Sequence, residues 1–230
     1  DGANTKMGSI FTPYAYYYAW NKANDWDKVS NGISSLFTMI TGAFAKDRII
    51  QLLRDFVFYP DDSKKSEAIV CRYPQFFAAR KMFTNIKQPL RPVGDGKGGT
   101  YFGATGCGKT YTMLFLSRMI ALRDPDTFNN PTIVIIVDRE DLDTQTAELF
   151  ATAKKYLHES DVRSIESRAD MEKTLGDRPS GGVYITSIQK FCEKTGLLSD
   201  RSNIICISDE AHRTQTGIGA KLKKTDKGVF

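Results

Sequence analysis

The sequence predicts an α/β fold, in which a parallel sheet is covered by helices on both faces, and two observations lead to this prediction. First, four short runs rich in β-branched and aromatic residues lack the apolar–polar alternation of a half-exposed strand; they cover residues 100–102, 132–138, 182–188 and 204–209. Second, segments with helical spacing separate these runs. Apolar strands that alternate with helices are typical of a sheet buried between two helical layers.

Helical patterns also precede the predicted sheet. Apolar residues from Val29 to Phe58 recur at helical spacing, and residues 73–83 predict a short helix with a proline in its first turn. Between the strands, residues 140–157 carry the clearest apolar stripe. Ser167 is predicted to cap the helix that begins after it, with Asp170 placed to answer it.

The length of the chain and a linker-like stretch near residue 60 suggest how the chain is divided. A chain of 230 residues can form one large domain with a smaller attachment. The proline and charges of residues 59–67 are typical of a linker. We therefore predict a helical lead-in segment over residues 1–70 and an α/β domain over residues 71–230.

Composition narrows the class of protein. Hydrophobic residues make up 41% and charged residues 26%, as in ordinary globular proteins, and the net charge of +5 permits nucleic-acid binding without indicating it. The 4 cysteines are scattered with no C-x-x-C pair, which disfavours a zinc site or a disulfide framework and favours reduced thiols in a cytoplasmic protein. No apolar run approaches the ~20 residues of a membrane span, so no membrane partner is expected.

The stretch "GATGCGKT" fits the pattern G-x-x-x-x-G-K-[ST] and sits between the predicted strand 100–102 and an apolar helical run. Its glycines allow main-chain N–H groups to surround phosphate oxygens at the start of a helix. Lys109 would face the β- and γ-phosphates of ATP, and the Thr110 hydroxyl would bind Mg²⁺. The predicted nucleotide-binding residues of the loop are Gly103, Ala104, Thr105, Gly106, Cys107, Gly108, Lys109 and Thr110. The alternative is a glycine turn that matches by chance.

A second motif, "DEAH", follows the apolar run "IICIS". Its carboxylates would emerge at the C-terminal end of a strand, where open α/β sheets bind ligands. Asp209 could hold Mg²⁺, and Glu210 could orient and deprotonate the attacking water. Taken alone, the motif could be the solvated acidic start of a helix. Together with the loop, it predicts catalysis by Lys109, Asp209 and Glu210.

Four segments in this order, "GATGCGKT", "IVDREDLDTQ", "GGVYITSIQKF" and "SDEAHRTQ", resemble the motor core of superfamily 2 helicases and translocases. More narrowly, they resemble the restriction (R) subunit of type I restriction–modification enzymes, as does "RYPQFFAARK" upstream. The resemblance extends over most of the chain. It implies a RecA-like P-loop fold, with residues 71–230 as the first ATPase lobe.

The resemblance also implies residue roles. Gln75 with Arg72 would recognise adenine, unless Gln75 only caps a surface helix. Cys107 replaces the serine more common in the family, and its small side chain still fits a phosphate loop. His212 would link nucleotide to movement of a partner lobe. Residues expected to face the DNA are Asp138, Arg139, Thr186, Ser187 and Gln189. For Arg139, a structural ion pair is an equal alternative, and the aromatic cluster of residues 14–20 is expected to pack in a core rather than stack on bases.

The implied function is an ATP-binding and ATP-hydrolysing motor lobe that, with Mg²⁺, moves double-stranded DNA before cleavage. The implied partners are the specificity and modification subunits and a second RecA-like lobe. No nuclease motif or second-lobe motif occurs in the chain, so we expect a fragment that is a very weak ATPase by itself. Two alternatives remain: a lobe of another superfamily 2 DNA or RNA helicase, and a P-loop scaffold that senses nucleotide without hydrolysing it.

Overall fold

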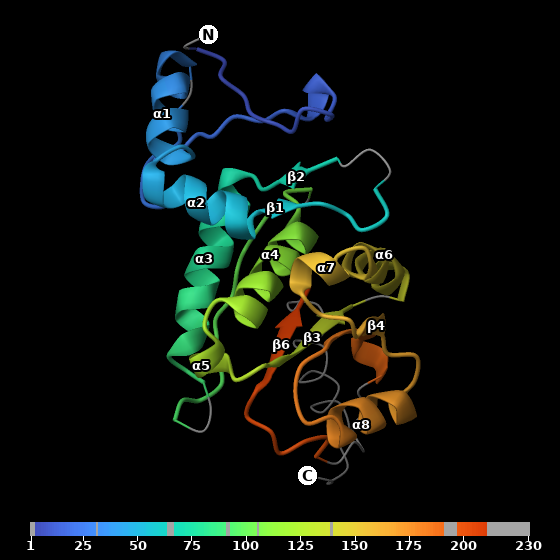
Figure 1. Cartoon of the computed structure of the whole chain (residues 1–230). Coiled ribbons are helices and arrows are strands. Elements are labelled where there is room, and N and C mark those ends of the chain that lie inside the picture. Colours follow the sequence, from blue (N-terminus) through green and yellow to red (C-terminus); the bar gives the residue numbers. More distant parts are fainter. Residues whose placement is uncertain are drawn as a thin grey trace, which may run out of the picture. The chain divides into compact units, whose positions relative to one another are not determined.

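The computed structural model describes residues 3–30, 32–63, 67–90, 93–104, 106–138, 140–190 and 197–210, without the side chains of residues 140–143. These residues form two compact units (Figure 1). Unit 1 comprises Asp1–Phe128 with Thr152–His158, and unit 2 comprises Asn129–Ala151 with Glu159–Phe230. The predicted division at residue 70 does not coincide with these units, and as a statement about domains it stays a prediction.

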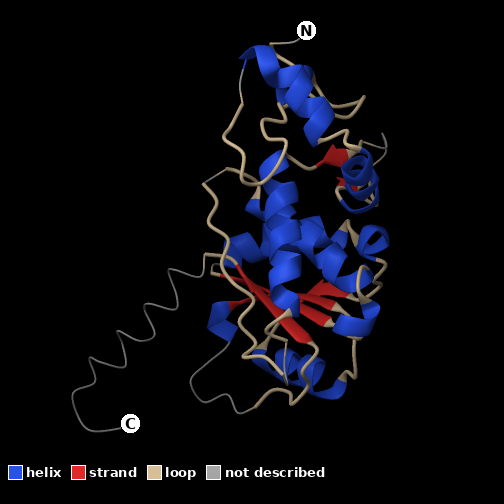
Figure 2. Cartoon of the chain, turned by 90° about the vertical axis from the view of Figure 1, so that its left-hand side faces the viewer, coloured by secondary structure: helices blue, strands red, loops and turns tan. Residues whose placement is uncertain are grey.

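Unit 2 is built on a four-stranded parallel sheet, with the strands in the order β4-β5-β3-β6. Its strands are among the red arrows in Figure 2. Its elements are β3 (Thr132–Val137), α6 (Glu140–Ala151), β4 (Val162–Ser164), α8 (Arg168–Asp177), β5 (Val183–Ser187), the 3₁₀ helix η3 (Ile188–Lys190) and β6 (Ile204–Ser208). The three later strand predictions are confirmed as β3, β5 and β6. The edge strand β4 was not predicted, because its sequence contains one β-branched residue, Val162, and no aromatic residue.

Helices cover both faces of this sheet. On one face, Met171 and Leu175 of α8 pack with Val134 of β3 and Tyr184 of β5 in a buried cluster. The connection from β3 to β4, through α6, runs along the sheet in the opposite direction to the connection from β4 to β5, through α8. Because both crossovers are expected to be right-handed, α6 belongs to the other face. The predicted α/β class is therefore confirmed.

The predicted helix over residues 140–157 is in fact two helices, because α6 ends at Ala151 and α7 covers Lys154–Leu157. Asp61 forms hydrogen bonds with the main chain between these two helices. The N–H of Asp61 donates to the carbonyl of Thr152 (2.7 Å), and the Asp61 carboxylate accepts from the N–H of Lys155 (3.1 Å). These bonds occupy groups that a continuous helix would use. The predicted cap of α8 is confirmed, because Ser167 Oγ accepts from the N–H of Asp170 (3.2 Å).

Unit 1 is mainly helical, with a two-stranded antiparallel sheet of two-residue strands. Its elements are η1 (Tyr14–Tyr16), η2 (Gly32–Ser34), α1 (Ser35–Gly42), α2 (Lys46–Asp55), β1 (Val57–Phe58), β2 (Ile69–Val70), α3 (Tyr73–Lys87), α4 (Lys109–Leu122), α5 (Pro125–Phe128) and α7. The predicted helices before the sheet are present as α1, α2 and α3. Helices α3 and α4 pack along each other.

The strand predicted at residues 100–102 is wrong: the chain has no regular structure from residue 97 to residue 104. The run is only three residues long and follows a stretch rich in glycine, which loses the most backbone freedom on becoming ordered. Its side chains also make no strand-like core, since Phe102 is 94% exposed while the Tyr101 hydroxyl approaches Cys107 Sγ (4.0 Å). The predicted nucleotide-binding loop, residues 103–110 (hereafter the nucleotide loop), therefore follows irregular chain and not a strand.

An aromatic core joins the N-terminal segment of unit 1 to α3. Trp20 is fully buried, and its ring lies 5.5 Å from that of Phe76, which in turn lies 4.7 Å from Phe56. A Cβ atom at Gly42 would lie only 2.6 Å from the Trp20 ring, so α1 can approach here only through a residue without a side chain. The expectation of core packing for the aromatic cluster is met by Trp20, whereas Tyr14 and Tyr16 are exposed.

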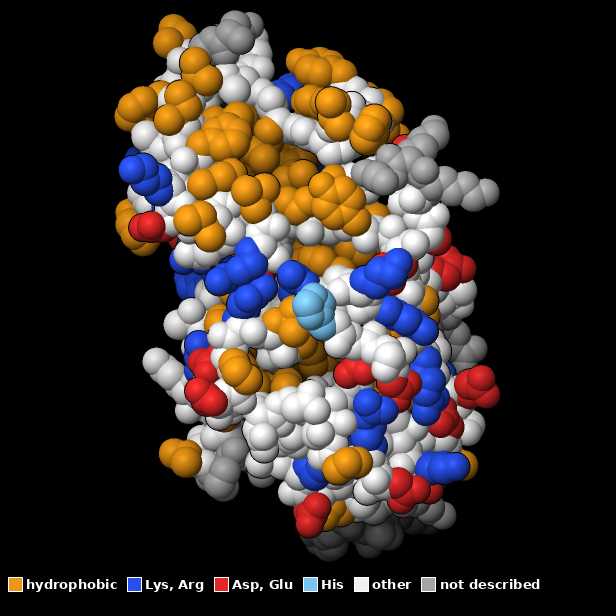
Figure 3. All heavy atoms as spheres, in the orientation of Figure 1, with side chains coloured by type: hydrophobic (Ala, Val, Ile, Leu, Met, Phe, Trp, Pro, Cys, Tyr) orange, Lys and Arg blue, Asp and Glu red, His pale blue; other side chains and the backbone are white. Residues whose placement is uncertain are grey.

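The apolar stripe of α1 faces solvent rather than the core. Ile33 of η2 and Phe37 and Ile40 of α1 are 91%, 69% and 51% exposed, while the buried residues of α1 are Ser35, Thr38, Met39 and Gly42. Figure 3 shows hydrophobic side chains gathered over α1 and the N-terminal segment. Despite this apolar surface, no helix in the described part of the chain has the length and hydropathy needed to cross a membrane.

A buried carboxylate ties α2 to α4. Asp55 is 1% exposed and accepts hydrogen bonds from Arg54 (2.8 Å) and from Arg123 Nε (2.6 Å), while Arg118 Nε lies 3.7 Å away. The Arg118 guanidinium also donates to the carbonyls of Arg54 (2.8 Å) and Tyr156, which brings α7 into the same network. A buried charge that is paired and hydrogen-bonded in this way is costly to disrupt from one side.

We expect Asp55→Ala to lower the free energy of unfolding by about 3–5 kcal/mol, because it leaves guanidinium groups without a counter-charge. Glu172→Ala is the matched control: it removes a carboxylate from an exposed pair with Arg168 (2.9 Å), which contributes less than about 1 kcal/mol. Urea unfolding of both variants measures the two losses. Equal losses would mean that the Asp55 network adds nothing beyond a surface ion pair.

Candidate functional site

The nucleotide loop of unit 1 takes a backbone conformation that requires glycine. Gly106 and Gly108 have φ of 77° and 80°, in the left-handed region that other residues rarely adopt. Gly108 is the N-cap of α4, and no side chain caps this helix. The first N–H groups of a helix lack hydrogen-bond partners within the helix. In α4, these groups belong to Lys109 and the residues directly after it.

Lys109 begins α4 and turns back onto the loop. Its ammonium group donates to the carbonyl of Gly103 (3.3 Å), which brings the two ends of the predicted motif together. Tyr101 is a loop residue that the sequence analysis missed. Burial, with Cys107 beside it, raises the pKa of Tyr101 to about 12. Its single signal in the sequence is its position just before the loop.

Gln75 connects α3 to the loop. It is 5% exposed, and its amide oxygen accepts from the N–H of Arg72 at the start of α3 (2.8 Å). Its amide nitrogen donates to the carbonyl of Gly108 (3.0 Å), and that of Cys107 lies 3.4 Å away. A Cβ atom at Gly108 would lie 2.4 Å from this nitrogen, so the contact itself requires glycine. The structure thus brings both ends of the amide against main chain.

These residues of unit 1 fit a nucleotide phosphate group. The arrangement combines an uncapped start of a 14-residue helix, glycines with φ near 80°, and a lysine ammonium on the loop itself. Such a helix start favours anions through its N–H groups and its dipole. Thr110, half-buried in the first turn of α4, is the hydroxyl of this set that could reach a magnesium ion.

In unit 2, the predicted acidic motif lies where expected, at the C-terminal end of β6. The N–H of Asp209 donates to the carbonyl of Ile136 in β3 (2.8 Å), which extends the strand pairing up to the motif. The N–H of Glu210 donates to the Asp209 carboxylate (2.9 Å). Glu210 has φ of 48°, a conformation that costs a non-glycine residue free energy and that recurs at functional sites.

The residues predicted to face DNA divide into an accessible pair and a buried pair. Gln189, exposed in η3, donates to the carbonyl of Asp138 (2.7 Å) after β3, so the ends of neighbouring strands are tied together. Thr186 and Ser187 are fully buried in β5, and among the described residues the Ser187 hydroxyl has no hydrogen-bond partner. Their hydroxyl groups are therefore not presented to a ligand at the surface.

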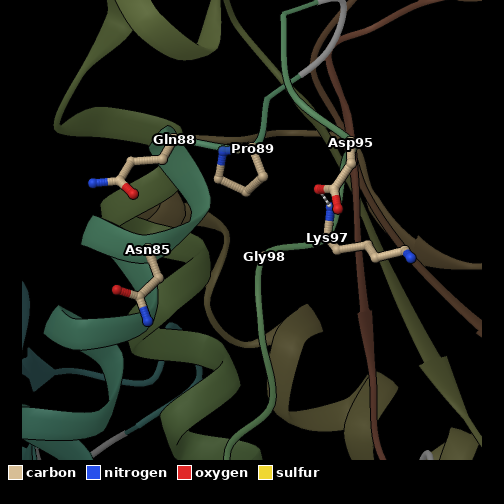
Figure 4. Close-up of a pocket in the computed structure, with 6 residues that line it drawn as sticks. All are labelled: Asn85, Gln88, Pro89, Asp95, Lys97 and Gly98. Carbon is tan, nitrogen blue, oxygen red and sulfur yellow. Dashed lines mark hydrogen bonds between the residues drawn. The ribbon is translucent and has the colours of Figure 1, made fainter.

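Three predicted site residues, Thr105, Arg139 and His212, lie outside the described residues. A pocket of 410 Å³ in unit 1 contains none of the predicted site residues. It is lined by Asn85, Gln88, Pro89, Asp95, Lys97 and Gly98. Figure 4 shows its loop held by the Asp95 carboxylate, which accepts from the N–H of Lys97 (2.9 Å). The candidate site is therefore a surface loop and a helix start rather than this pocket.

Comparison with known proteins agrees with this reading of the motifs. Over 230 residues the chain is 29% identical to the type I restriction enzyme HindI endonuclease subunit of Haemophilus influenzae, which covers 96% of the chain. It is 32% identical over 97% of its length to a protein assigned as the type I restriction enzyme MjaIXP endonuclease subunit of Methanocaldococcus jannaschii. The predicted resemblance to type I restriction enzyme R subunits is confirmed.

The chain spans 22% and 23% of the length of these two relatives. Over residues 74–227, it matches the family model of the SWI2/SNF2 ATPase. This match contains α3, the nucleotide loop, the parallel sheet and the acidic motif, and it accounts for the RecA-like fold. The chain therefore belongs to the SWI2/SNF2 ATPase family.

Proposed function

We propose that this chain is the ATP-binding and ATP-hydrolysing motor lobe of a type I restriction enzyme R subunit, which couples ATP hydrolysis to movement along double-stranded DNA. The observation that carries the proposal is the loop of unit 1, where the uncapped start of α4 and the Lys109 ammonium come together. Family membership supports ATP as the nucleotide. Similarity to restriction endonuclease subunits supports DNA as the substrate of the larger assembly.

In this proposal, the loop binds the phosphates of ATP. The main-chain N–H groups after Gly108 and the Lys109 ammonium contact the β- and γ-phosphates. Thr110 of unit 1 and Asp209 of unit 2 are the residues that would each offer an oxygen to Mg²⁺, whose charge would neutralise that of the phosphates. Arg72 and Gln75 contact the adenine. The Gln75 amide lies between the start of α3 and the loop, and it would have to exchange its main-chain hydrogen bonds to contact the edge of a base.

Glu210 is the proposed general base. A carboxylate that follows a strand end can orient a water molecule and accept its proton, and phosphoryl transfer depends mainly on such positioning. Its left-handed backbone supports this role, because strain of this kind is retained where a side chain must be aimed. Its neighbour Asp209 fixes it through the hydrogen bond to the Glu210 N–H.

The proposed DNA-facing edge lies at the C-terminal ends of β3 and β5. Asp138 and Gln189 meet there. Because Thr186 and Ser187 are buried, we assign phosphate contacts to Gln189 and to main-chain N–H groups rather than to those hydroxyls. Arg139 and His212 keep their proposed roles in DNA contact and in coupling. The proposed partners are a second RecA-like lobe and the specificity and modification subunits.

We expect Lys109→Ala to weaken ATP binding by roughly a hundredfold or more, because it removes the main cation facing the phosphates. Lys97→Ala, at an exposed lysine upstream of the loop, is the control and should leave the affinity unchanged. Titration with a fluorescent ATP analogue measures both. Equal affinity of Lys109→Ala and the wild-type protein would remove the loop from the binding site.

Replacing Gln75 with Ala tests adenine recognition. The variant should lose more affinity for ATP than for GTP, because good hydrogen bonds to a base edge contribute about 1–3 kcal/mol of discrimination. The loss of its bonds to the loop should weaken both nucleotides to a smaller extent. Competition titrations with ATP and GTP separate the two effects. An equal fall for both would mean that Gln75 acts on the loop and does not read the base.

Glu210→Gln should retain ATP binding but lower the rate of hydrolysis by about 10²–10⁴-fold, because the amide cannot accept the proton of the attacking water. Because this chain is expected to be a very weak ATPase by itself, phosphate release is measured under single-turnover conditions with the chain joined to its proposed second lobe, and an ATP titration of the same sample supplies the control. A variant that hydrolyses ATP at the wild-type rate would show that Glu210 is not the base.

A further inference from the structure

Tyr18 reaches the start of α3 from the N-terminal segment. Its hydroxyl lies 2.5 Å from the carbonyl oxygen of Val70 and 2.6 Å from that of Cys71, so its one proton is shared between two consecutive acceptors. Burial raises the pKa of this phenol, which keeps it a donor at any physiological pH. The two carbonyls immediately precede Arg72. Tyr18 therefore fixes the main chain from which Arg72 projects.

The same ring supports the Arg72 side chain. The Arg72 guanidinium lies over the Tyr18 ring, 5.7 Å from its centroid, and Arg72 is exposed. A guanidinium that rests on an aromatic face is held as a plane, and its opposite face can stack on another flat group. Holding it beforehand also lowers the side-chain entropy lost when a ligand binds.

Gln75 places this plane next to the nucleotide loop. One end of its amide accepts from the N–H of Arg72, and the other donates to the carbonyl of Gly108. One side chain therefore spans the gap between Arg72 and the loop. All of these residues belong to unit 1. Through Gln75, the residue that carries the guanidinium plane is therefore connected to the loop that binds phosphate in the proposed function.

We propose that Tyr18 is a positioning residue for base recognition, which holds the Arg72 guanidinium in place to stack on the purine of the bound nucleotide. The inference rests on the proposed function, since it needs a nucleotide on the loop. It assigns a role to a residue 54 positions before Arg72 that lies outside the matched family region, which begins at residue 74.

The neighbouring tyrosines do not share this role. Tyr14 and Tyr16 are each 67% exposed. Tyr17 donates to the carbonyl of Ser9 (3.0 Å), a contact within the N-terminal segment. Tyr17 is therefore a matched control for Tyr18, with the same side chain in the same segment but without contact to the start of α3.

The test compares a ligand that has a base with one that does not. Binding of Mg-ATP and of magnesium tripolyphosphate to the full chain is measured by calorimetry for the wild-type protein, Tyr18→Leu, Tyr18→Phe and Tyr17→Leu. We expect Tyr18→Leu to weaken ATP by about tenfold through loss of the stacked guanidinium, with tripolyphosphate unchanged. Tyr18→Phe keeps the ring and should recover most of the ATP affinity, and Tyr17→Leu should match the wild-type protein.

Equal losses for ATP and tripolyphosphate in Tyr18→Leu would overturn the inference, because a general disturbance of the fold weakens both ligands. An ATP affinity that is unchanged in Tyr18→Leu would overturn the inference as well. If Lys109→Ala weakens ATP binding in the same experiments, the proposed function stands even though this inference fails. If Tyr18→Leu does not fold, Tyr18→Met takes its place, because methionine also lacks the aromatic ring and its flexible side chain fills irregular spaces, and a loss confined to ATP is the supporting result. A wild-type protein that binds neither ligand would overturn the proposed function, and this inference with it.

Discussion

The carboxamide of Gln75 is buried between two pieces of main chain and satisfies both, the start of α3 and the end of the nucleotide loop. This contact matters because no strand precedes the loop, so the usual rigid support on that side is replaced by side-chain hydrogen bonds. Lys109 closes the loop from the other end through the Gly103 carbonyl. Glycine at position 108 follows from the same contact, since a Cβ atom there would meet the Gln75 nitrogen.

The remainder of unit 1 holds in place the two helices that this amide connects. Helix α3 is anchored by Trp20 and Phe56 on its buried face, and α4 is anchored by the network around Asp55. Both anchors join segments far apart in the sequence, so the helix starts that flank the loop are set by packing rather than by local preference. The N-terminal segment is thereby part of the support for the nucleotide loop, although the family match begins after it.

In unit 2, the parallel direction of the strands brings the predicted site residues together. Parallel strands carry their C-terminal ends to one edge of the sheet, and β5, β3 and β6 are neighbours. One edge of the sheet therefore carries Gln189, Asp138 and Asp209. Gln189 donates to the carbonyl of Asp138, and the N–H of Asp209 donates to the carbonyl of Ile136 in the neighbouring strand. This edge gathers the groups that the proposed function assigns to DNA, Mg²⁺ and water.

The sequence by itself determined the α/β class, the strands β3, β5 and β6, the Ser167 cap and the resemblance to restriction enzyme subunits, because strand composition, capping and motif spacing are local properties. Other features were decided only by tertiary structure. The run at residues 100–102 forms no strand, Asp61 interrupts the helix predicted over residues 140–157, and Thr186 and Ser187 are buried. Each of these depends on which distant group competes for a main-chain or side-chain partner. The bonds from Gln75 to the Gly108 carbonyl and from Tyr18 to the Cys71 carbonyl are of the same kind, since they join residues more than 30 positions apart, and no local pattern encodes them.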